Sequence, residues 1–192
     1  MATMTNRAVF LDMQGTLGGD AFGDIRDFTF FPFAIAAIRL LNESGVLAIV
    51  ITNQTRISRG LLTIEFFWDR IGSLRDELGA SGAHLDAVYC CPHQDSDNCN
   101  CKKPKPGLVL QAQRDHHLDL ESCYVVGDLG KGDMTLARSV GCKAVLVLTG
   151  AGETSLGEFR HTWADISPDF VAEDVLAAVK WILSDIKEIP RR

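Results

Sequence analysis

Short apolar runs alternate with stretches of helical periodicity along most of this sequence. Runs of strand-forming residues occupy 8–11, 46–51, 87–90, 124–126 and 144–148. Apolar residues recur at helical spacing over 32–42, 63–78, 106–116, 133–140 and 175–186. This alternation predicts a Rossmann-like α/β fold, a three-layer sandwich in which helices cover both faces of a mostly parallel central sheet.

The chain length is compatible with one domain spanning residues 1–192. With 192 residues, of which 46% are hydrophobic, the chain can bury one sizeable core but is short for two. The connections after the first and third apolar runs are too short to hold a folded lid, so we expect no large cap domain. The Gly- and Asp-rich segment 18–27 lies beside the first run and is a candidate substrate loop without a packed element of its own.

Charge and hydropathy exclude several classes of function. The net charge of −6 disfavours a general nucleic-acid surface, which needs a basic stripe to neutralise phosphates. No run of eighteen apolar residues could cross a membrane, and no secretory signal precedes the first strand. We therefore expect a cytoplasmic protein that binds neither nucleic acid nor membrane.

Polar residues follow four of the apolar runs where each predicted strand ends. They are Asp12, Thr52 with Asn53, Lys103 and Asp128. Because the carboxyl ends of parallel strands line the ligand crevice of such a sheet, these side chains should lie together. They supply a carboxylate nucleophile, a second carboxylate for a divalent cation, a lysine and a neutral donor, which suits phosphoryl transfer with Mg²⁺.

A cysteine-rich loop follows the third run. Cys91, His93, Cys99 and Cys101 form a Cys-x-His and Cys-x-Cys pattern in a segment too polar to be core. Three thiolates and one imidazole satisfy a tetrahedral structural Zn²⁺ with no open position for catalysis. The alternative is four unrelated reduced residues, since a disulfide framework is not expected in a reducing compartment. A zinc ion would stiffen the loop and hold Lys102 and Lys103 over the predicted site.

Five motifs together resemble the haloacid dehalogenase superfamily of phosphotransferases. In order they are FLDMQGTL, ITNQTRISRG, CPHQDSDNCNCKKPKPG, YVVGDLGKGDM and VLTG. Within that superfamily the sequence is most similar to the heptose 1,7-bisphosphate 7-phosphatases and their histidinol-phosphatase relatives. The resemblance covers essentially the whole chain and includes the zinc loop.

The resemblance implies a phosphoric monoester hydrolase that forms an aspartyl-phosphate on Asp12. Asp128 and the backbone carbonyl of Gln14 would join Asp12 around Mg²⁺, while Thr52 and Lys103 hold the phosphoryl group. Asp133 would support this site. Four further residues match substrate-contacting positions of the family: Asn53, Gln54, Thr55 and Lys102.

Gln14 is the main departure from the family pattern, which has an aspartate here that protonates the leaving group and then activates water. A glutamine side chain can do neither, although its backbone carbonyl is unaffected. General acid–base catalysis contributes about 10² to 10⁴ in rate. Three interpretations follow: a slow phosphatase that uses water as its acid, an enzyme whose aspartyl-phosphate passes to another acceptor, or a binding protein without turnover.

The expected substrate is a small phosphorylated molecule. On the resemblance it is the 7-phosphate of D-glycero-D-manno-heptose 1,7-bisphosphate, with histidinol phosphate as the alternative. A catalytically weakened phosphosugar-binding or regulatory protein is the alternative outside the enzymes. Arg56 and Lys102 stand where the heptose phosphatases usually have glycine and arginine, at positions where specificity would be determined. We expect a monomer.

Overall fold

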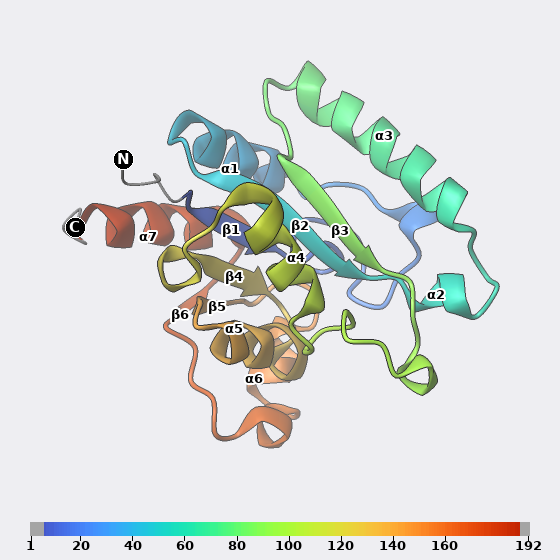
Figure 1. Ribbon diagram of the computed structural model, residues 1–192. Coiled ribbons are helices and arrows are strands. Elements are labelled where there is room, and N and C mark those ends of the chain that lie inside the picture. Colours follow the sequence, from blue (N-terminus) through green and yellow to red (C-terminus); the bar gives the residue numbers. More distant parts are fainter. Residues whose placement is uncertain (1–5, 189–192) are drawn as a thin grey trace.

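A six-stranded sheet, in which all neighbouring strands are parallel, forms the centre of the protein (Figure 1). The computed structural model describes residues 6–188. The strands are β1 (Ala8–Leu11), β2 (Leu47–Asn53), β3 (Ala87–Cys91), β4 (Tyr124–Gly127), β5 (Lys143–Val147) and β6 (Phe170–Ala172). Their spatial order is β3-β2-β1-β4-β5-β6, as in doubly wound nucleotide-binding folds.

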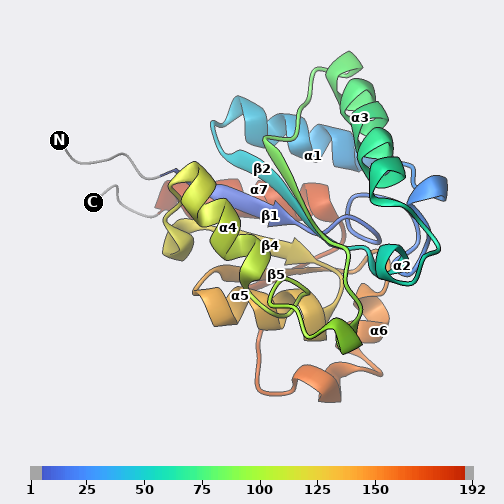
Figure 2. The same ribbon diagram turned by 45° about the vertical axis from the view of Figure 1, so that its right-hand side comes forward.

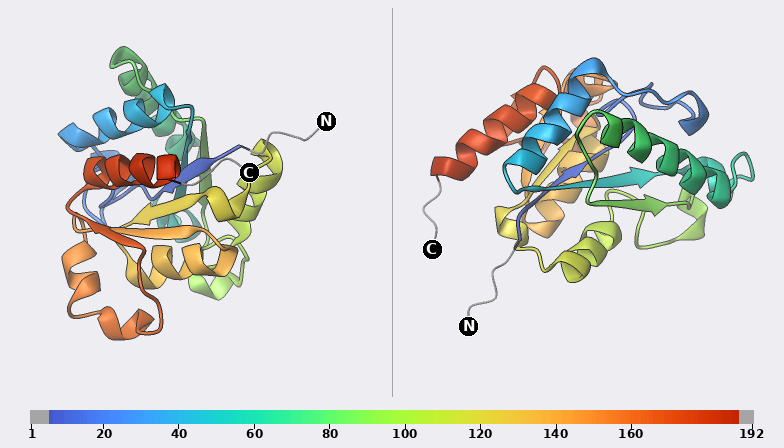
Figure 3. Two further views of the ribbon diagram at one scale, coloured as in Figure 1. Left: turned by 90° about the vertical axis from the view of Figure 1, so that its left-hand side faces the viewer. Right: turned by 90° about the horizontal axis from the view of Figure 1, so that it is seen from above.

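Helices cover both faces of the sheet (Figure 3). One layer contains α1 (Pro32–Glu43), α3 (Ile64–Ala80) and α7 (Val175–Glu188), and the other contains α4 (Gly107–His116) and α5 (Thr135–Val140). Two short helices, α2 (Thr55–Ser58) and α6 (Gly152–Leu156), follow the carboxyl ends of β2 and β5. The predicted three-layer α/β fold is confirmed.

Alternation along the strands explains why the sheet needs two helical layers. In β1, Val9 and Leu11 pack in the core with α1, α3 and α7, whereas Ala8 and Phe10 pack in the core with α4 and α5. All four side chains are fully buried. Because β1 is buried on both faces, all of its residues are apolar, and the sequence there is a continuous hydrophobic run.

The strand order creates a switch point between β1 and β4. From β1 the chain moves outward to β2 and β3, then returns to the other side of β1 for β4, β5 and β6. The connections that leave β1 and β4 therefore diverge at the carboxyl ends of these strands, which is where ligands bind in open α/β sheets.

Three elements differ from the sequence prediction. The sequence pattern predicts no element between residue 150 and the helix expected from 175, but the structure contains α6 and β6 there. The short helix α2 was also not expected. These elements have three to five residues each, too few to show a periodicity, and β6 is specified by pairing with β5 rather than by its own pattern.

The segment between β1 and α1 forms a flap, defined here as residues 18–30. An antiparallel bridge joins Gly18 to Phe30 at its base, and a 3-10 turn occupies Ile25–Asp27. The expectation that residues 18–27 contain no packed element is wrong, because Ile25 is fully buried in the core with Phe28. Within residues 6–188, the connections after β1 and β3 carry only 3-10 turns, and every helix is too short or too polar to span a bilayer.

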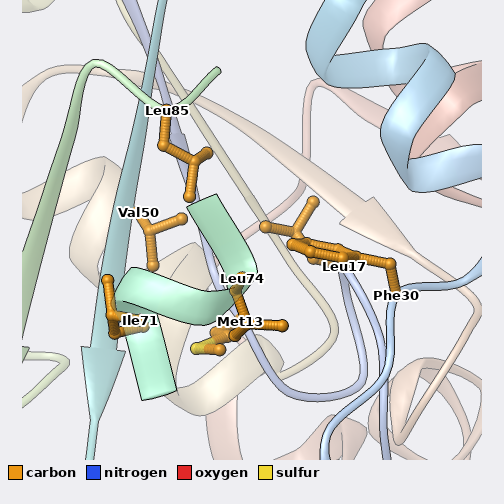
Figure 4. Close-up of a pocket in the computed structure, with 7 residues that line it drawn as sticks. All are labelled: Met13, Leu17, Phe30, Val50, Ile71, Leu74 and Leu85. Atoms are coloured by element: carbon orange, nitrogen blue, oxygen red, sulfur yellow. The ribbon is translucent and has the colours of Figure 1, made fainter. Parts of the chain in front are cut away.

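A small apolar cavity lies between the sheet and α3 (Figure 4). Its volume is about 10 Å³, at the lower limit for one water molecule. The lining residues are Met13, Leu17, Phe30, Val50, Ile71, Leu74 and Leu85. This space is a packing imperfection behind the flap and not a ligand site.

Candidate active site

The switch point places two aspartates at one edge of the sheet. Asp12 follows β1, and its backbone amide donates to the carbonyl of Val126 at 2.9 Å. Asp128 follows β4 and is fully buried, whereas the Asp12 side chain retains 11% exposure. Asp12 is therefore the carboxylate of this pair that a ligand at this edge of the sheet can reach.

Lys103 brings a positive charge to this edge. Its Nζ contacts a carboxylate oxygen of Asp12 and lies 2.8 Å from Oδ1 of Asp133. The other oxygen of Asp133 accepts a hydrogen bond from the Leu129 amide at 3.1 Å. Burial lowers the pKa of Lys103, but the two carboxylates outweigh burial and raise it above its usual range. Lys103 is thus held as an ammonium beside Asp12.

Asp128 is less well compensated. Its Oδ2 accepts a hydrogen bond from the Ala151 amide at 2.7 Å, but its buried Oδ1 has no hydrogen-bond partner among the described residues. Burial, reinforced by the charges of Asp12 and Asp133, raises the pKa of Asp128 to about 8. Burial likewise raises the pKa of Asp12 to about 6, against the opposing charge of Lys103.

The donor set at this edge fits a divalent cation. Asp12, Asp128 and Asp133 each offer an oxygen, and these atoms lie within 4.8 Å of one another. Three acidic side chains share one lysine, and the buried Oδ1 of Asp128 has an acceptor position that no described residue uses. Hard oxygen donors of this kind suit Mg²⁺.

Two glycines make room for Asp128. Gly15 and Gly150 have positive φ angles of 82° and 58°, and a Cβ on either would collide with Oδ2 of Asp128. The hydroxyl of Thr149 also donates to the Gly15 carbonyl at 2.7 Å. Thr149 and Ala151 are not predicted as site residues in the sequence analysis. The VLTG motif, which contains Thr149, indicates this segment from the sequence.

A chain of side-chain hydrogen bonds borders the carboxylates. Gln54 Nε2 donates to the hydroxyl oxygen of Thr52 at 2.9 Å and to Oε1 of Gln14 at 2.8 Å. Gln14 Nε2 in turn donates to the carbonyl of Gly23 in the flap at 2.9 Å. Thr52 and Gln54 are buried. The Gln14 amide therefore links the end of β2 to the flap.

Asn53 holds the main chain of Lys103. Its Oδ1 accepts from the Lys103 amide at 3.0 Å, and its Nδ2 donates to the Lys103 carbonyl at 3.3 Å. Both polar groups of Asn53, a predicted substrate contact, are thus engaged within the protein. Thr55, the first residue of α2, lies half-buried on the same edge.

A basic cavity of about 120 Å³ adjoins the buried site. Its charged lining comprises Lys102, Lys103, Lys105 and Asp95. Lys102 Nζ lies 2.8 Å from Oδ1 of Asp95, whose side chain is 95% exposed. Because Lys103 contributes to both this cavity and the carboxylate cluster, an anion in the cavity would lie next to the site.

The four predicted zinc ligands lie together between β3 and α4. Their donor atoms lie within 4.8 Å of one another, with closest approaches of 3.1 Å between the sulfurs of Cys101 and Cys91 and 3.3 Å between His93 Nδ1 and the Cys101 sulfur. Cys99 completes the group, and all of these cysteines are free thiols. Tetrahedral zinc, with bonds of about 2.3 Å to sulfur, separates its ligands by about 3.8 Å, so these side chains fit the ion.

This cysteine loop packs against α2 (Figure 2). The Ser58 hydroxyl donates to Asp97 at 2.6 Å, and the Ser58 amide donates to the Pro92 carbonyl at 3.0 Å. The loop then runs directly into Lys102 and Lys103. The position of the lysines therefore depends on the order of the loop.

Comparisons with known proteins identify the family of this chain. Residues 100–178 match the model of the HAD-hydrolase-like family. The D-glycero-β-D-manno-heptose-1,7-bisphosphate 7-phosphatase of Yersinia pestis is 34% identical over 98% of this chain and 96% of its own length. The corresponding enzyme of Helicobacter pylori strain J99 is 36% identical over 76% of this chain and 84% of its own length.

A solved structure shares the whole architecture. The D,D-heptose 1,7-bisphosphate phosphatase from B. bronchiseptica, complexed with magnesium and phosphate, superposes with a TM-score of 0.83 at 28% identity. The match covers 94% of this chain and 99% of that chain.

Proposed function

Because the chain belongs to the haloacid dehalogenase-like family of D-glycero-D-manno-heptose-1,7-bisphosphate 7-phosphatases, we propose that it hydrolyses the 7-phosphate of this sugar bisphosphate. As a member of this family it is a phosphoric monoester hydrolase. The relatives favour the heptose substrate over histidinol phosphate, the alternative considered from the sequence.

The observation that carries the proposal is the partly exposed Asp12 carboxylate beside the ammonium of Lys103. In the proposed reaction an oxygen of Asp12 attacks phosphorus, and the bond from phosphorus to the sugar oxygen breaks. Water then attacks the resulting aspartyl-phosphate and releases phosphate. Lys103 and the hydroxyl of Thr52 offset the charge of the transferring group, while Asp133 holds Lys103 in place.

We assign the Mg²⁺ site to Asp12, Asp128 and the backbone carbonyl of Gln14. The free Oδ1 of Asp128 and the excess of carboxylates over lysine support this assignment. When bound, the ion would neutralise charge on the phosphoryl oxygens. Asp133 is left out of this set because its two oxygens hold Lys103 and the Leu129 amide, which suits a role in positioning Lys103.

We assign the second metal site, for a structural Zn²⁺, to Cys91, His93, Cys99 and Cys101. Backbone amides of Lys102 and Cys101 oppose the effect of burial and lower the pKa of Cys99 to about 7, which favours the thiolate that zinc needs. The sugar phosphate would contact Lys102, which lines the basic cavity, together with Gln54 and Thr55, whereas Asn53 would position the main chain of Lys103.

Gln14 determines how fast such an enzyme can be. Its amide is neutral and is hydrogen-bonded to Gln54 and to the flap, so leaving-group protonation must come from water. This observation favours a slow phosphatase. It also supports the second candidate function, a phosphosugar-binding protein whose aspartyl-phosphate persists or does not form.

Phosphate release from heptose 1,7-bisphosphate with Mg²⁺ tests the proposal on the native protein, Asp12→Asn and Gln14→Asp. We expect slow turnover that Asp12→Asn abolishes. A native protein without turnover and an active Gln14→Asp would instead support the binding function. If none of the three proteins releases phosphate, both the substrate and the catalytic assignment are contradicted.

A further inference from the structure

The flap of residues 18–30 lies directly against the carboxylate cluster. At its base, the Gly19 amide donates to the Thr29 carbonyl at 3.1 Å. At its tip, Ala21 packs on Gly15: a Cβ on Gly15 would lie 3.1 Å from the Ala21 Cα and would also collide with Asp128. Gly15 therefore separates the flap tip from Asp128, although only the base of the flap is held by strand-like pairing.

Gln14 fastens one side of the tip. Its Nε2 donates to the Gly23 carbonyl at 2.9 Å, and its Oε1 accepts from Gln54 at 2.8 Å. This link needs a donor and an acceptor in one side chain. A carboxylate at position 14 would accept from Gln54 but would face the Gly23 carbonyl without a proton to donate.

Arg56 fastens the other side. Its Nη2 donates to the Phe22 carbonyl at 3.3 Å, and its Nε lies 3.6 Å from Oδ2 of Asp24. Asp24 also pairs with Arg26 at 2.6 Å, and Arg26 donates to the Leu61 carbonyl at 3.3 Å. The flap tip is thus tied to the segment around α2 through side chains from both partners.

We propose that Gln14 and Arg56 act together as positioning residues that hold the flap closed over Asp12. We call the contacts that these two side chains make with the flap the clasp. Both residues differ from the family pattern, and the clasp gives both differences the same structural explanation. A closed flap confines the bound substrate beside Asp12, at the expense of a carboxyl group at position 14. The catalytic meaning of closure rests on the proposed phosphatase function, whereas the clasp itself does not.

Hydrogen–deuterium exchange of residues 18–30 tests the clasp without any turnover. We expect amide exchange in this segment to accelerate about tenfold in Arg56→Ala and in Gln14→Glu, because each variant loses contacts to the tip. Arg56→Lys, which can still pair with Asp24, should restore most of the protection. Arg59→Ala is the matched control, since Arg59 is exposed and its side chain forms no hydrogen bond or ion pair within residues 6–188.

Kinetics separate positioning from folding. In Arg56→Ala we expect KM for heptose 1,7-bisphosphate to rise about fivefold or more while kcat changes less than twofold, and Arg56→Lys should reverse the change in KM. A loss of kcat at unchanged KM would overturn the positioning role.

Unchanged flap exchange in both Arg56→Ala and Gln14→Glu would overturn the proposal, as would equal acceleration in Arg59→Ala. An enzyme without turnover would contradict the proposed function instead. In that case the exchange data would still decide whether the clasp exists.

Discussion

Single residues in this protein are held by contacts that decide their chemistry. Asp128 is buried and accepts one hydrogen bond from the residues that the structure describes, and an unsatisfied buried oxygen costs about 1–3 kcal/mol. Asn53 is the opposite case, because each polar group of its side chain has a partner on Lys103. Substitution of Asp128 should therefore impair metal binding, and substitution of Asn53 should impair catalysis.

Asp128→Asn should raise the melting temperature of the metal-free protein and abolish its stabilisation by Mg²⁺. The neutral amide removes the cost of a buried charge and, secondarily, the repulsion from Asp12 and Asp133, which together raise the pKa of Asp128 to about 8. Thermal melts with EDTA and with Mg²⁺ measure both effects. Asp165→Asn, at an exposed site, is the control. A full Mg²⁺ response in Asp128→Asn would refute the metal assignment.

Asn53→Ala should lower kcat about tenfold or more, because two hydrogen bonds worth about 1 kcal/mol each no longer position Lys103. Asn53→Asp, which keeps the acceptor for the Lys103 amide, should lose less. Steady-state phosphate release measures the effect. An unaltered kcat in Asn53→Ala would mean that Lys103 needs no such support.

At the scale of elements, helices and loops are stabilised in different ways. Helix α3 begins at a hydrogen-bonded cap, in which Thr63 Oγ1 accepts from the Phe66 amide, and it buries an apolar stripe that includes Phe67 and Leu74. The loop after β3 has no such stripe, and the four proposed zinc ligands lie together within it. Core substitutions should therefore destabilise α3, whereas metal removal should disorder the loop after β3.

Leu74→Ala should destabilise the protein by about 2–5 kcal/mol, because it enlarges an existing cavity under α3. Trp68→Ala on the same helix should have a much smaller effect, since Trp68 is 43% exposed. Urea unfolding compares the two free energies. Equal losses would indicate that α3 is not anchored by its buried stripe.

Metal analysis should find close to one zinc ion per chain, and Cys99→Ser should lower this ratio. Removal of zinc should expose the segment 92–103 to proteases, because the loop has little apolar surface to bury. The same treatment should lower kcat, since the loop leads into Lys103. A zinc-free protein with an ordered, protease-resistant loop would contradict the site.

For the whole molecule, one sheet connects both helical layers. Trp181 on α7 is partly buried and packs against the core on one face, and Trp163 is buried in the core on the other. Because the strands contribute side chains to both cores, neither layer should unfold alone. This is the physical basis for proposing a single domain.

Urea unfolding of the zinc-loaded protein should therefore be one cooperative transition. Fluorescence of single-tryptophan variants that retain Trp163 or Trp181 should coincide with circular dichroism. Two separated midpoints would show that the layers are independent units.

The sequence by itself determined the α/β class, most element positions and the identity of the chemical groups. Each apolar run and helical stripe is a local pattern, and residues such as Asp12 and Asp128 are found simply because they follow strands. The grouping of Cys91, His93, Cys99 and Cys101 is equally local, because all four lie in one loop.

Only the tertiary structure decided the relations between distant segments. Pairing with β5 specifies β6, whose three residues carry no periodicity. The free oxygen of Asp128, the engagement of Asn53 by Lys103 and the clasp of Gln14 and Arg56 on the flap are likewise invisible in the sequence. Each depends on how the backbone brings remote residues within hydrogen-bond distance, and neither residue type nor spacing along the chain encodes that distance.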